Sequence, residues 1–332
     1  MLLSNVRRSA LLNWVNFMPE TIKLLCRQCR SKLDLTGEEP FSKVMCPVCG
    51  AVLRVPMVFG SYLLEKVCGI GGMSVVYRAI DSSRKNRVAV KVLQKEFIQE
   101  DPEAERYVTE KKYVELIDHP GVIPIYDAGM EKDLPFLAMM YMDDGSLQEK
   151  LDRQQLPEIS QLCRWMAEIA DALATAHCHN IVHHDLKPGN ILLSGNGEAR
   201  LGDFDLADIR EKGDMHPISE WWGSPGYASP ERLTYGGEDY RGDIFSLGVT
   251  LYELLAGKQP FPSNANDADL LLKLRREQDF QALYELRRDI PLELSELVTR
   301  MLRYAPEARP DYAEITRVLN SAVRQLTALK EQ

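Results

Sequence analysis

The chain has 332 residues and a net charge of −9, and 45% of its residues are hydrophobic and 27% charged. This length allows a large core and more than one domain, and the composition is ordinary for a globular protein. The negative charge argues against a broad electrostatic grip on nucleic acid. No apolar run in the sequence reaches the roughly 20 residues that span a bilayer.

The N-terminal part of the chain is basic, unlike the rest. Residues 1–60 contain eight Lys and Arg against four Asp and Glu. Residues 1–20 carry two Arg and a short apolar patch, without the long apolar core and small-residue cleavage site of a signal peptide. We expect these residues to form a flexible extension, and Met18 is an alternative start of the chain.

Four of the seven cysteines form two C-x-x-C pairs with 16 residues between them: Cys26 with Cys29, and Cys46 with Cys49. Structural Zn²⁺ prefers a tetrahedron of four thiolates, which two such pairs can supply. An odd cysteine total with paired spacing fits a metal site in a reducing cytosol better than a disulfide framework. Residues 21–55 resemble a zinc ribbon. The alternatives are four unrelated buried cysteines, or a redox pair, although no thioredoxin-type strand–helix pattern follows either motif.

The segment after residue 60 begins with strand patterns. β-branched residues between polar turns predict strands, and apolar residues three and four apart predict a helix. The expected strands are 62–67, 74–80, 87–93, 121–129 and 135–142, and the expected helix is 102–117. The connection from the last ribbon cysteine to the first of these strands is short, so we expect the ribbon to sit against this β-rich part.

The later part of the chain is mainly helical. Helices are expected at 161–177, at 243–257, at 294–302 and finally through the 320s. A small β-rich part followed by a larger helical part predicts an α+β protein with two lobes.

A glycine-rich stretch lies between the first two expected strands of the β-rich part. Gly69, Gly71 and Gly72 would let backbone N–H groups approach phosphate oxygens closely. Lys91 lies in the middle of the third strand, and Glu110 on the following helix could pair with it and hold it on phosphates. Taken singly, these features also fit a plain glycine hairpin and a solvated lysine.

A cluster of polar residues follows in the helical part: Asp185, Lys187 and Asn190, and then Asp203. Two carboxylates and an amide can hold Mg²⁺ through hard oxygen ligands. Phosphoryl transfer needs a metal and a cation to neutralise phosphate charge, and a carboxylate to orient the attacking hydroxyl. The cluster therefore indicates phosphoryl transfer.

The order and spacing of these motifs resemble those of a protein kinase. Residues 60–325 are similar to the Ser/Thr kinases of bacteria that share the eukaryotic fold. The resemblance implies the bilobal kinase fold, with a β-rich N-lobe at 60–140 and a helical C-lobe at 144–325, preceded by the small zinc-ribbon module. It implies ATP and Mg²⁺ (or Mn²⁺) as cofactors beside structural Zn²⁺, and Ser or Thr hydroxyls of proteins as substrates.

The resemblance also assigns catalytic roles. By this resemblance Asp185 is the catalytic base, Lys187 steadies the γ-phosphate, and Asn190 and Asp203 bind Mg²⁺. The D-L-K-P-x-N pattern that contains Lys187 is the form found in Ser/Thr kinases.

Further roles concern the nucleotide and the fold. The resemblance implies that Lys91 contacts the α and β phosphates and pairs with Glu110, and that Glu231 pairs with Arg309 in a structural role. The residues expected to surround ATP are Gly69, Gly71, Gly72, Val76, Ala89, Lys91, Glu110, Met140 and Met142.

Two positions depart from the family pattern. His184 stands where the family has an Arg that binds a phosphate on the activation loop and orders that loop. A neutral His does this poorly, and Ser219 is the one loop hydroxyl that no motif explains, so we predict that activation-loop phosphorylation is not a required switch. The alternative is that His184 has no regulatory meaning. Asp205 replaces a glycine that permits backbone rotation, which keeps a nucleotide-binding pseudokinase scaffold as an alternative function.

We expect a bacterial signalling kinase of the cytoplasm without a membrane segment. The chain ends soon after its last expected helix, so we expect its input to be cytosolic. The ribbon is expected to be a docking or regulatory module for a protein partner. A zinc-dependent nucleic-acid adaptor is the competing class, but residues 1–60 lack interleaved aromatic and basic residues. We assign His177 and His183 to packing and hydrogen bonding, and Cys68 to apolar filling.

Overall fold

The computed structural model of the chain describes residues 22–26, 28–71, 74–94, 103–209, 223–234, 237–261, 268–277 and 280–328. The extension expected at 1–20, Gly72 and Ser219 lie outside these residues. The chain divides into two compact units, Met1–Lys111 with Ile125–Tyr141 and Lys112–Pro124 with Met142–Gln332. Within the described part, no helix combines the length and the apolar character that crossing a membrane requires.

Two small hairpins form the N-terminal module of the first unit, which we call the ribbon (residues 22–55). β1 (Lys23–Leu25) pairs antiparallel with β2 (Lys32–Asp34), and β3 (Lys43–Met45) pairs antiparallel with β4 (Val52–Arg54). The buried core of the ribbon consists of Ile22, Cys26, Leu33, Leu35, Cys46 and Val55. So few apolar residues supply little stability, and small modules of this kind usually depend on a metal or on disulfides.

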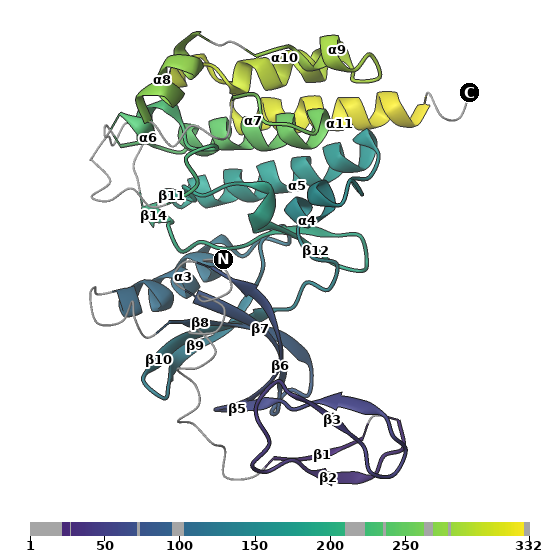
Figure 1. Cartoon of the computed structure of the whole chain (residues 1–332). Coiled ribbons are helices and arrows are strands. Elements are labelled where there is room, and N and C mark those ends of the chain that lie inside the picture. The colour runs from purple at the N-terminus through teal and green to yellow at the C-terminus, as the bar shows by residue number, and fades with distance from the viewer. Residues whose placement is uncertain are drawn as a thin grey trace. The chain divides into compact units, whose positions relative to one another are not determined.

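A six-stranded antiparallel sheet forms most of the rest of the first unit (Figure 1). Its strand order is β5–β6–β7–β8–β10–β9. The strands are β5 (Met57–Phe59), β6 (Tyr62–Ile70), β7 (Ser74–Asp81), β8 (Arg87–Leu93), β9 (Ile125–Glu131) and β10 (Leu134–Met140). Helix α3 (Glu103–Ile117) lies between β8 and β9 in the chain. β8 is buried on both faces after its first residue, which fits its nearly continuous apolar sequence.

The ribbon contacts the sheet directly within the first unit. The ring of Phe41 stacks on Tyr77 of β7 with 5.8 Å between ring centroids. Val58 of β5 packs against the ribbon core, and β5 pairs with β6. The expectation that the ribbon sits against the β-rich part is therefore confirmed.

The second unit is mainly helical. Its helix α5 (Ile159–Cys178) packs against α11 (Tyr312–Ala328), and α7 (Arg241–Ala256) is buried along nearly its whole length. The other helices are α4 (Leu147–Asp152), α6 (Pro230–Leu233), α8 (Ala268–Glu277), α9 (Leu283–Leu286) and α10 (Leu292–Met301). The strand pairs are β11 (Ile181–Val182) with β14 (Asp208–Ile209), and β12 (Ile191–Leu193) with β13 (Ala199–Leu201).

Each helix and strand expected after residue 60 is present, most of them with shifted ends, while β8 has the expected bounds. The strand expected at 121–129 begins only at Ile125, after Pro124, because proline has no N–H to donate to the sheet. Elements of two to four residues, such as β5, β11 and α9, were not predicted. Such short elements show too few residues for a hydrophobic period to be recognised.

Candidate active site

Lys91 and Glu110 form a buried ion pair in the first unit. Lys91 lies on β8, opposite Val76 of β7 and Leu137 of β10. Its Nζ is 3.8 Å from Glu110 Oε2, and the two side chains are 6% and 2% exposed. A buried ammonium needs such a partner, and it has three N–H donors. The pair therefore fixes a positive charge at a defined point of the sheet, as expected from the sequence.

The glycine-rich turn joins β6 to β7. Gly69 is paired with Val76, and the Gly71 N–H donates to the Ser74 carbonyl at 2.8 Å. Gly69 and Gly71 are exposed, and a Cβ atom added to Gly69 would meet nothing within 4 Å. Packing in this structure therefore does not demand glycine at Gly69. Glycine at this position instead leaves the backbone without a side chain that would cover it.

The other residues expected around the nucleotide are apolar. Ala89 is two residues from Lys91 on β8 and Val76 is directly opposite Lys91, so these three share one face of the sheet. Met140 ends β10 and pairs with Val88. Met142 is buried in the second unit. The first unit thus presents an apolar surface beside a fixed positive charge.

Asp185 lies in the loop between β11 and a 3₁₀ turn at Pro188–Asn190. Lys187 Nζ donates to Asp185 Oδ2 at 2.6 Å and to Ser224 Oγ at 2.8 Å. Asn190 Nδ2 donates to the Asp185 carbonyl at 2.8 Å and to Oδ2 at 3.1 Å. Asp185 Oδ1 is buried and has no hydrogen-bond partner among the described residues. Such atoms are uncommon, so Oδ1 is available to accept a hydrogen bond from a ligand.

His183 and Asp243 fix the backbone on either side of this carboxylate. Asp243 Oδ2 and Oδ1 accept the N–H groups of His183 at 2.7 Å and His184 at 2.9 Å. His183 Nε2 donates to the Gly202 carbonyl at 3.1 Å, which leaves Nδ1 to accept the Asp185 N–H at 3.2 Å. Burial raises the pKa of Asp243. His183 is thus a hydrogen-bonding residue, as expected, whereas the role of Asp243 was not predicted.

Asp203 follows β13 and lies in a segment held against Asn190. The Gly202 N–H donates to the Asn190 carbonyl at 3.0 Å. Asp203 has a φ of 66°, in the left-handed region, which costs a non-glycine residue roughly 1 kcal/mol. Phe204 packs its ring edge-to-face on His183 at 4.6 Å. An amide oxygen from Asn190 and a carboxylate from Asp203 are ligands of the kind that Mg²⁺ prefers.

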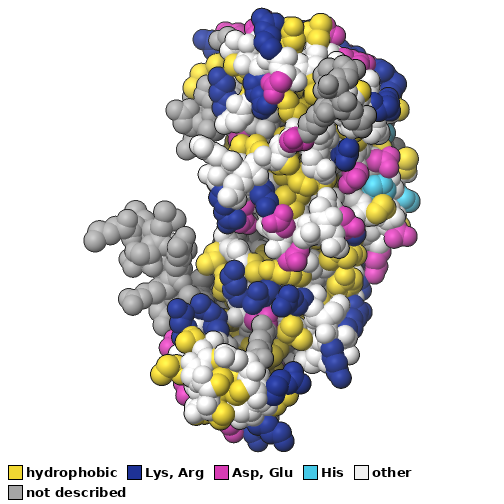
Figure 2. Space-filling view, turned by 90° about the vertical axis from the view of Figure 1, so that its right-hand side faces the viewer, with side chains coloured by type: hydrophobic (Ala, Val, Ile, Leu, Met, Phe, Trp, Pro, Cys, Tyr) yellow, Lys and Arg dark blue, Asp and Glu magenta, His cyan; other side chains and the backbone are white. Residues whose placement is uncertain are grey.

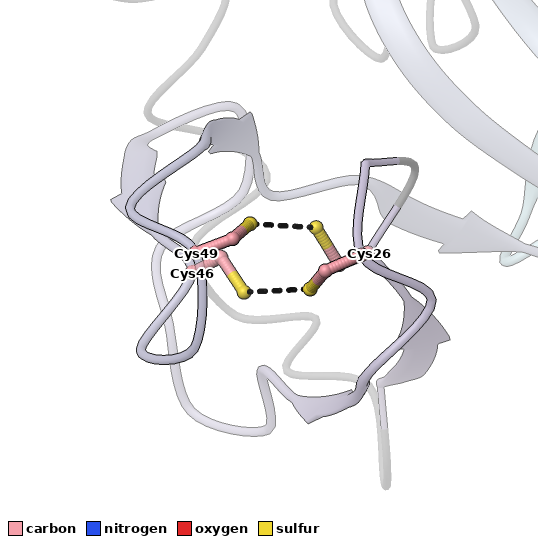
Figure 3. Close-up of side chains that lie close together, drawn as sticks. Cys26, Cys46 and Cys49 are labelled. Atoms are coloured by element: carbon pink, nitrogen blue, oxygen red, sulfur yellow. Dashed lines mark hydrogen bonds between the residues drawn. The ribbon is translucent and has the colours of Figure 1, made fainter.

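The four ribbon cysteines converge on one point, as Figure 3 shows for the labelled Cys26, Cys46 and Cys49. All four Sγ atoms lie within 4.8 Å of one another, and the Cys26–Cys49 and Cys29–Cys46 Sγ distances are 3.7 Å. A tetrahedral Zn²⁺ with Zn–S bonds of about 2.3 Å requires S–S edges of about 3.8 Å. The thiols therefore fit a zinc ion. Among the described residues, no other group of three or more His, Cys, Asp or Glu side chains shares this geometry.

Hydrogen bonding prepares part of this cluster for a cation. The Ser31 hydroxyl lies 3.0 Å from Cys29 Sγ and 3.4 Å from Cys46 Sγ. It lowers the pKa of both thiols, that of Cys46 to about 6. The pKa of Cys49 is raised to about 12, because burial and the other three thiols outweigh the lowering by the Ala51 N–H. Thiolates bind metals, so the cluster can be fully ionised only with a cation at its centre.

Sequence reasoning placed Glu231 and Arg309 correctly but missed a second cluster. Arg309 Nη1 is 2.6 Å from Glu231 Oε1, as expected. His184, treated above as unable to bind a phosphate well, instead makes a hydrogen bond through Nδ1 to Glu238 Oε1 at 2.8 Å. Arg232 Nη1 donates to the same oxygen at 3.0 Å. Glu238 lies far from His184 in the chain, so no local motif could have indicated the contact.

Comparison with known proteins gives consistent matches. Residues 62–320 match the family model described as protein kinase domain. A probable serine/threonine-protein kinase of Clostridium acetobutylicum is 31% identical over 268 residues, which is 79% of this chain and 40% of that protein. Serine/threonine-protein kinase PrkC of Bacillus subtilis is 32% identical over 220 residues, 66% of this chain and 34% of PrkC. Serine/threonine-protein kinase SIK1 of Rattus norvegicus is 33% identical over 267 residues, 78% of this chain and 32% of SIK1. The chain thus spans well under half the length of these relatives.

Proposed function

Because this chain belongs to the protein kinase domain family, we propose that it transfers the γ-phosphate of ATP to Ser or Thr hydroxyls of protein substrates. One observation carries the proposal. Asp185 is held by Lys187 and Asn190 through Oδ2, while its buried Oδ1 has no partner among the described residues. A carboxylate oxygen in this state is suited to orient an attacking hydroxyl and to take its proton.

The residues around Asp185 have complementary roles. Lys187, within 2.6 Å of Asp185 and 2.8 Å of the Ser224 hydroxyl, would steady the negative charge of the transferred phosphoryl group. Asn190 donates to Asp185 through its amide nitrogen, so its amide oxygen would be the atom that binds the metal, together with the Asp203 carboxylate. Mg²⁺ bound there with ATP would neutralise phosphate charge. In the first unit, Lys91 would bind the α and β phosphates, and the apolar residues Val76, Ala89 and Met140 would contact adenine. Met142 of the second unit is proposed for the same role.

The decisive test is transfer of labelled phosphate from ATP and Mg²⁺ to the chain itself and to a generic basic protein. Wild type should incorporate label, and Asp185→Asn should lose it, because the amide cannot accept the proton. Nucleotide binding by both proteins without label in either would favour the pseudokinase scaffold. That alternative is motivated by Asp205 in place of a glycine.

We further propose that phosphorylation of the activation loop is not required. The support is the contact of His184 with an internal carboxylate, Glu238, at 2.8 Å. Ser219→Ala should therefore retain the activity of wild type. Abolished transfer in this variant, with an unchanged melting temperature, would contradict the proposal.

The ribbon is proposed to hold one structural Zn²⁺ on Cys26, Cys29, Cys46 and Cys49. Its support is the sulfur geometry, with 3.7 Å edges close to those of a zinc–thiolate tetrahedron. All seven cysteines of the chain are free of disulfides, which fits a reducing compartment such as the bacterial cytoplasm. Metal analysis of the purified chain should find one zinc per molecule.

The outer face of the β3–β4 hairpin is proposed to bind a protein partner. Met45 is paired with Val52 and Lys43 with Arg54, and with this spacing all four side chains lie on one face. Met45, Val48 and Val52 are 74%, 70% and 65% exposed. Figure 2 shows hydrophobic and basic side chains side by side at the bottom of the view. Exposed apolar patches rimmed by charge often mark interfaces, and this one fits an acidic protein surface.

A variant that introduces negative charge tests this face. A partner is first captured with the wild-type chain, and its binding is then confirmed with both proteins purified. The double variant Met45→Asp with Val52→Asp should abolish this binding. Lys32→Asp on β2 of the other ribbon hairpin is a control for charge alone. Binding of single-stranded nucleic acid that weakens steeply with salt would favour the adaptor function instead.

The domain limits proposed are an N-terminal extension at 1–20, the zinc ribbon at 21–55 and the kinase domain at 60–325. The start of the family match at residue 62 supports the last of these. Limited proteolysis should cut first before residue 21, and cleavage inside 60–325 that precedes it would contradict these limits.

A further inference from the structure

Glu238 is the centre of a buried charge cluster beside the loop that carries Asp185. Its Oε1 accepts hydrogen bonds from His184 Nδ1 at 2.8 Å and Arg232 Nη1 at 3.0 Å, and its Oε2 accepts one from the Ser229 hydroxyl at 2.5 Å. The His184 and Glu238 side chains are each 2% exposed. Burial alone would raise the pKa of Glu238, but His184, Arg232 and Ser229 lower it to about 2. Glu238 is therefore an anion at neutral pH.

This cluster holds the residue that directly precedes Asp185. Arg232 Nη1 also donates to the His184 carbonyl at 2.5 Å, and the His184 N–H donates to Asp243 Oδ1 at 2.9 Å. His184 has a φ of 67°, a conformation that non-glycine residues adopt only when their surroundings enforce it. Glu238 holds the His184 side chain and, through Arg232, also its carbonyl. The backbone entering Asp185 therefore depends on the Glu238 carboxylate.

The start of α7 leaves space for this carboxylate. A Cβ atom at Gly242 would collide with Glu238 Oε2 and with the carbon atoms next to it. The clash involves the atoms that receive the Ser229 hydrogen bond, so the side chain could not move away without losing that bond. The lack of a side chain at Gly242 is therefore a second observation, independent of the hydrogen bonds, that supports the observed position of the Glu238 carboxylate.

We infer that Glu238 is a positioning residue for phosphoryl transfer. It holds His184 and Arg232, and through them Asp185, in the arrangement that the reaction needs. This inference rests on the function proposed above. A phosphate added to a protein orders a segment by supplying negative charge to cationic donors. Here Glu238 supplies that charge from within the fold, so the loop that carries Asp185 is ordered without phosphorylation.

The test is the isosteric variant Glu238→Gln, which keeps the shape and removes the charge. Full-length protein is treated with a phosphatase, its mass is checked, and kcat and the KM for ATP are measured. We expect kcat to fall about 10- to 100-fold, because small displacements of a catalytic group have effects of this size. The KM for ATP should be unchanged, because none of the groups that Glu238 contacts is assigned to the nucleotide.

Asp239→Asn is the matched control. Asp239 is an adjacent buried carboxylate, 2% exposed, and its side chain pairs with Arg241 at 2.7 Å. The substitution removes the same charge from the same segment. Because Asp239 pairs with Arg241 and Glu238 with His184 and Arg232, Asp239→Asn should leave kcat as in wild type. An equal loss of kcat in both variants would mean that buried charge in this segment serves the fold in general, and it would overturn the inference.

Two further results separate the possible outcomes. If Glu238→Gln does not fold, the double variant Glu238→Gln with Arg232→Gln removes both charges of this contact, and it should show the same loss of kcat with an unchanged KM. Full activity of either folded variant would overturn the inference. A wild type that transfers no phosphate would count against the proposed function. Equal transfer by wild type and Glu238→Gln would contradict the positioning role of Glu238 and would leave the proposed function intact.

Discussion

The buried ion pair between Glu231 and Arg309 allows a stability prediction with a defined magnitude. Arg309 Nη1 and Nη2 lie 2.6 and 2.8 Å from the two carboxylate oxygens of Glu231, and the Arg309 side chain is fully buried. Its other hydrogen bonds go to the backbone carbonyls of Arg303, Arg241 and Tyr304. The guanidinium also lies over the Phe245 ring at 5.1 Å from its centroid.

Glu231→Gln removes the carboxylate charge and leaves this guanidinium buried. Breaking a buried pair from one side costs about 3–5 kcal/mol. Arg309 keeps three carbonyl acceptors, so the loss should fall at the lower end, about 3 kcal/mol. For a unit of this size, that lowers the melting temperature by about 10 °C. Urea unfolding followed by fluorescence would give the free energy of unfolding directly.

The control is an ion pair of the same type on the surface. Arg317 Nη1 lies 3.4 Å from Glu293 Oε1, and these side chains are 61% and 51% exposed. Exposed pairs contribute about 0–1 kcal/mol, so Glu293→Gln should change the free energy of unfolding little. If Glu231→Gln destabilises the protein no more than Glu293→Gln does, the reasoning from burial is wrong.

Three further predictions follow from the ribbon and from the Glu238 cluster. Cys46→Ser should reduce the zinc content from one per chain to near zero by mass spectrometry, and retained zinc would exclude Cys46 as a ligand. Gly242→Ala should lower the melting temperature by several degrees, because its Cβ would clash with Glu238, and an unchanged melting curve would show that the cluster can move aside. The pKa of Glu238 is lowered from 4.5 to about 2 in the fold. Its contribution to stability is therefore complete above pH 4.5 and is lost as the pH falls toward 2, so Glu238→Gln should flatten this part of an acid-unfolding curve.

Much of the fold could be predicted from local sequence patterns. The alternating and continuous apolar residues of Arg87–Leu93 indicate a strand, and the structure has β8 over those same residues. The helix expected at 243–257 is α7, which begins only two residues earlier. The C-x-x-C pairs predicted a cation site because each motif fixes two ligands within a few residues of chain, and the Sγ atoms converge as expected. In these cases the pattern and the structure extend over the same short stretch.

The parts that could not be predicted depend on contacts between distant segments. Glu238 lies 54 residues from His184, and nothing in the sequence around either residue reveals the pair. Comparison with the family pattern showed only that His184 stands in place of an arginine. It did not show which group the His184 side chain contacts. In the same way, the 2.7 Å bond from His183 N–H to Asp243 spans 60 residues. Local patterns give the elements, whereas the packing of the second unit decides which polar groups meet.

The strand β5 has a consequence for how the chain can be shortened. The family match begins at residue 62, the first residue of β6, and so leaves β5 (Met57–Phe59) outside it. A chain cut at that point would uncover one side of the nine-residue strand β6 at Tyr62–Leu64, where β5 now pairs. Unpaired strand edges are templates for association with other molecules, and a three-residue edge strand such as β5 is a poor one. The strand β5 thus protects the sheet from aggregation, and a shortened chain that contains the kinase domain should begin before Met57.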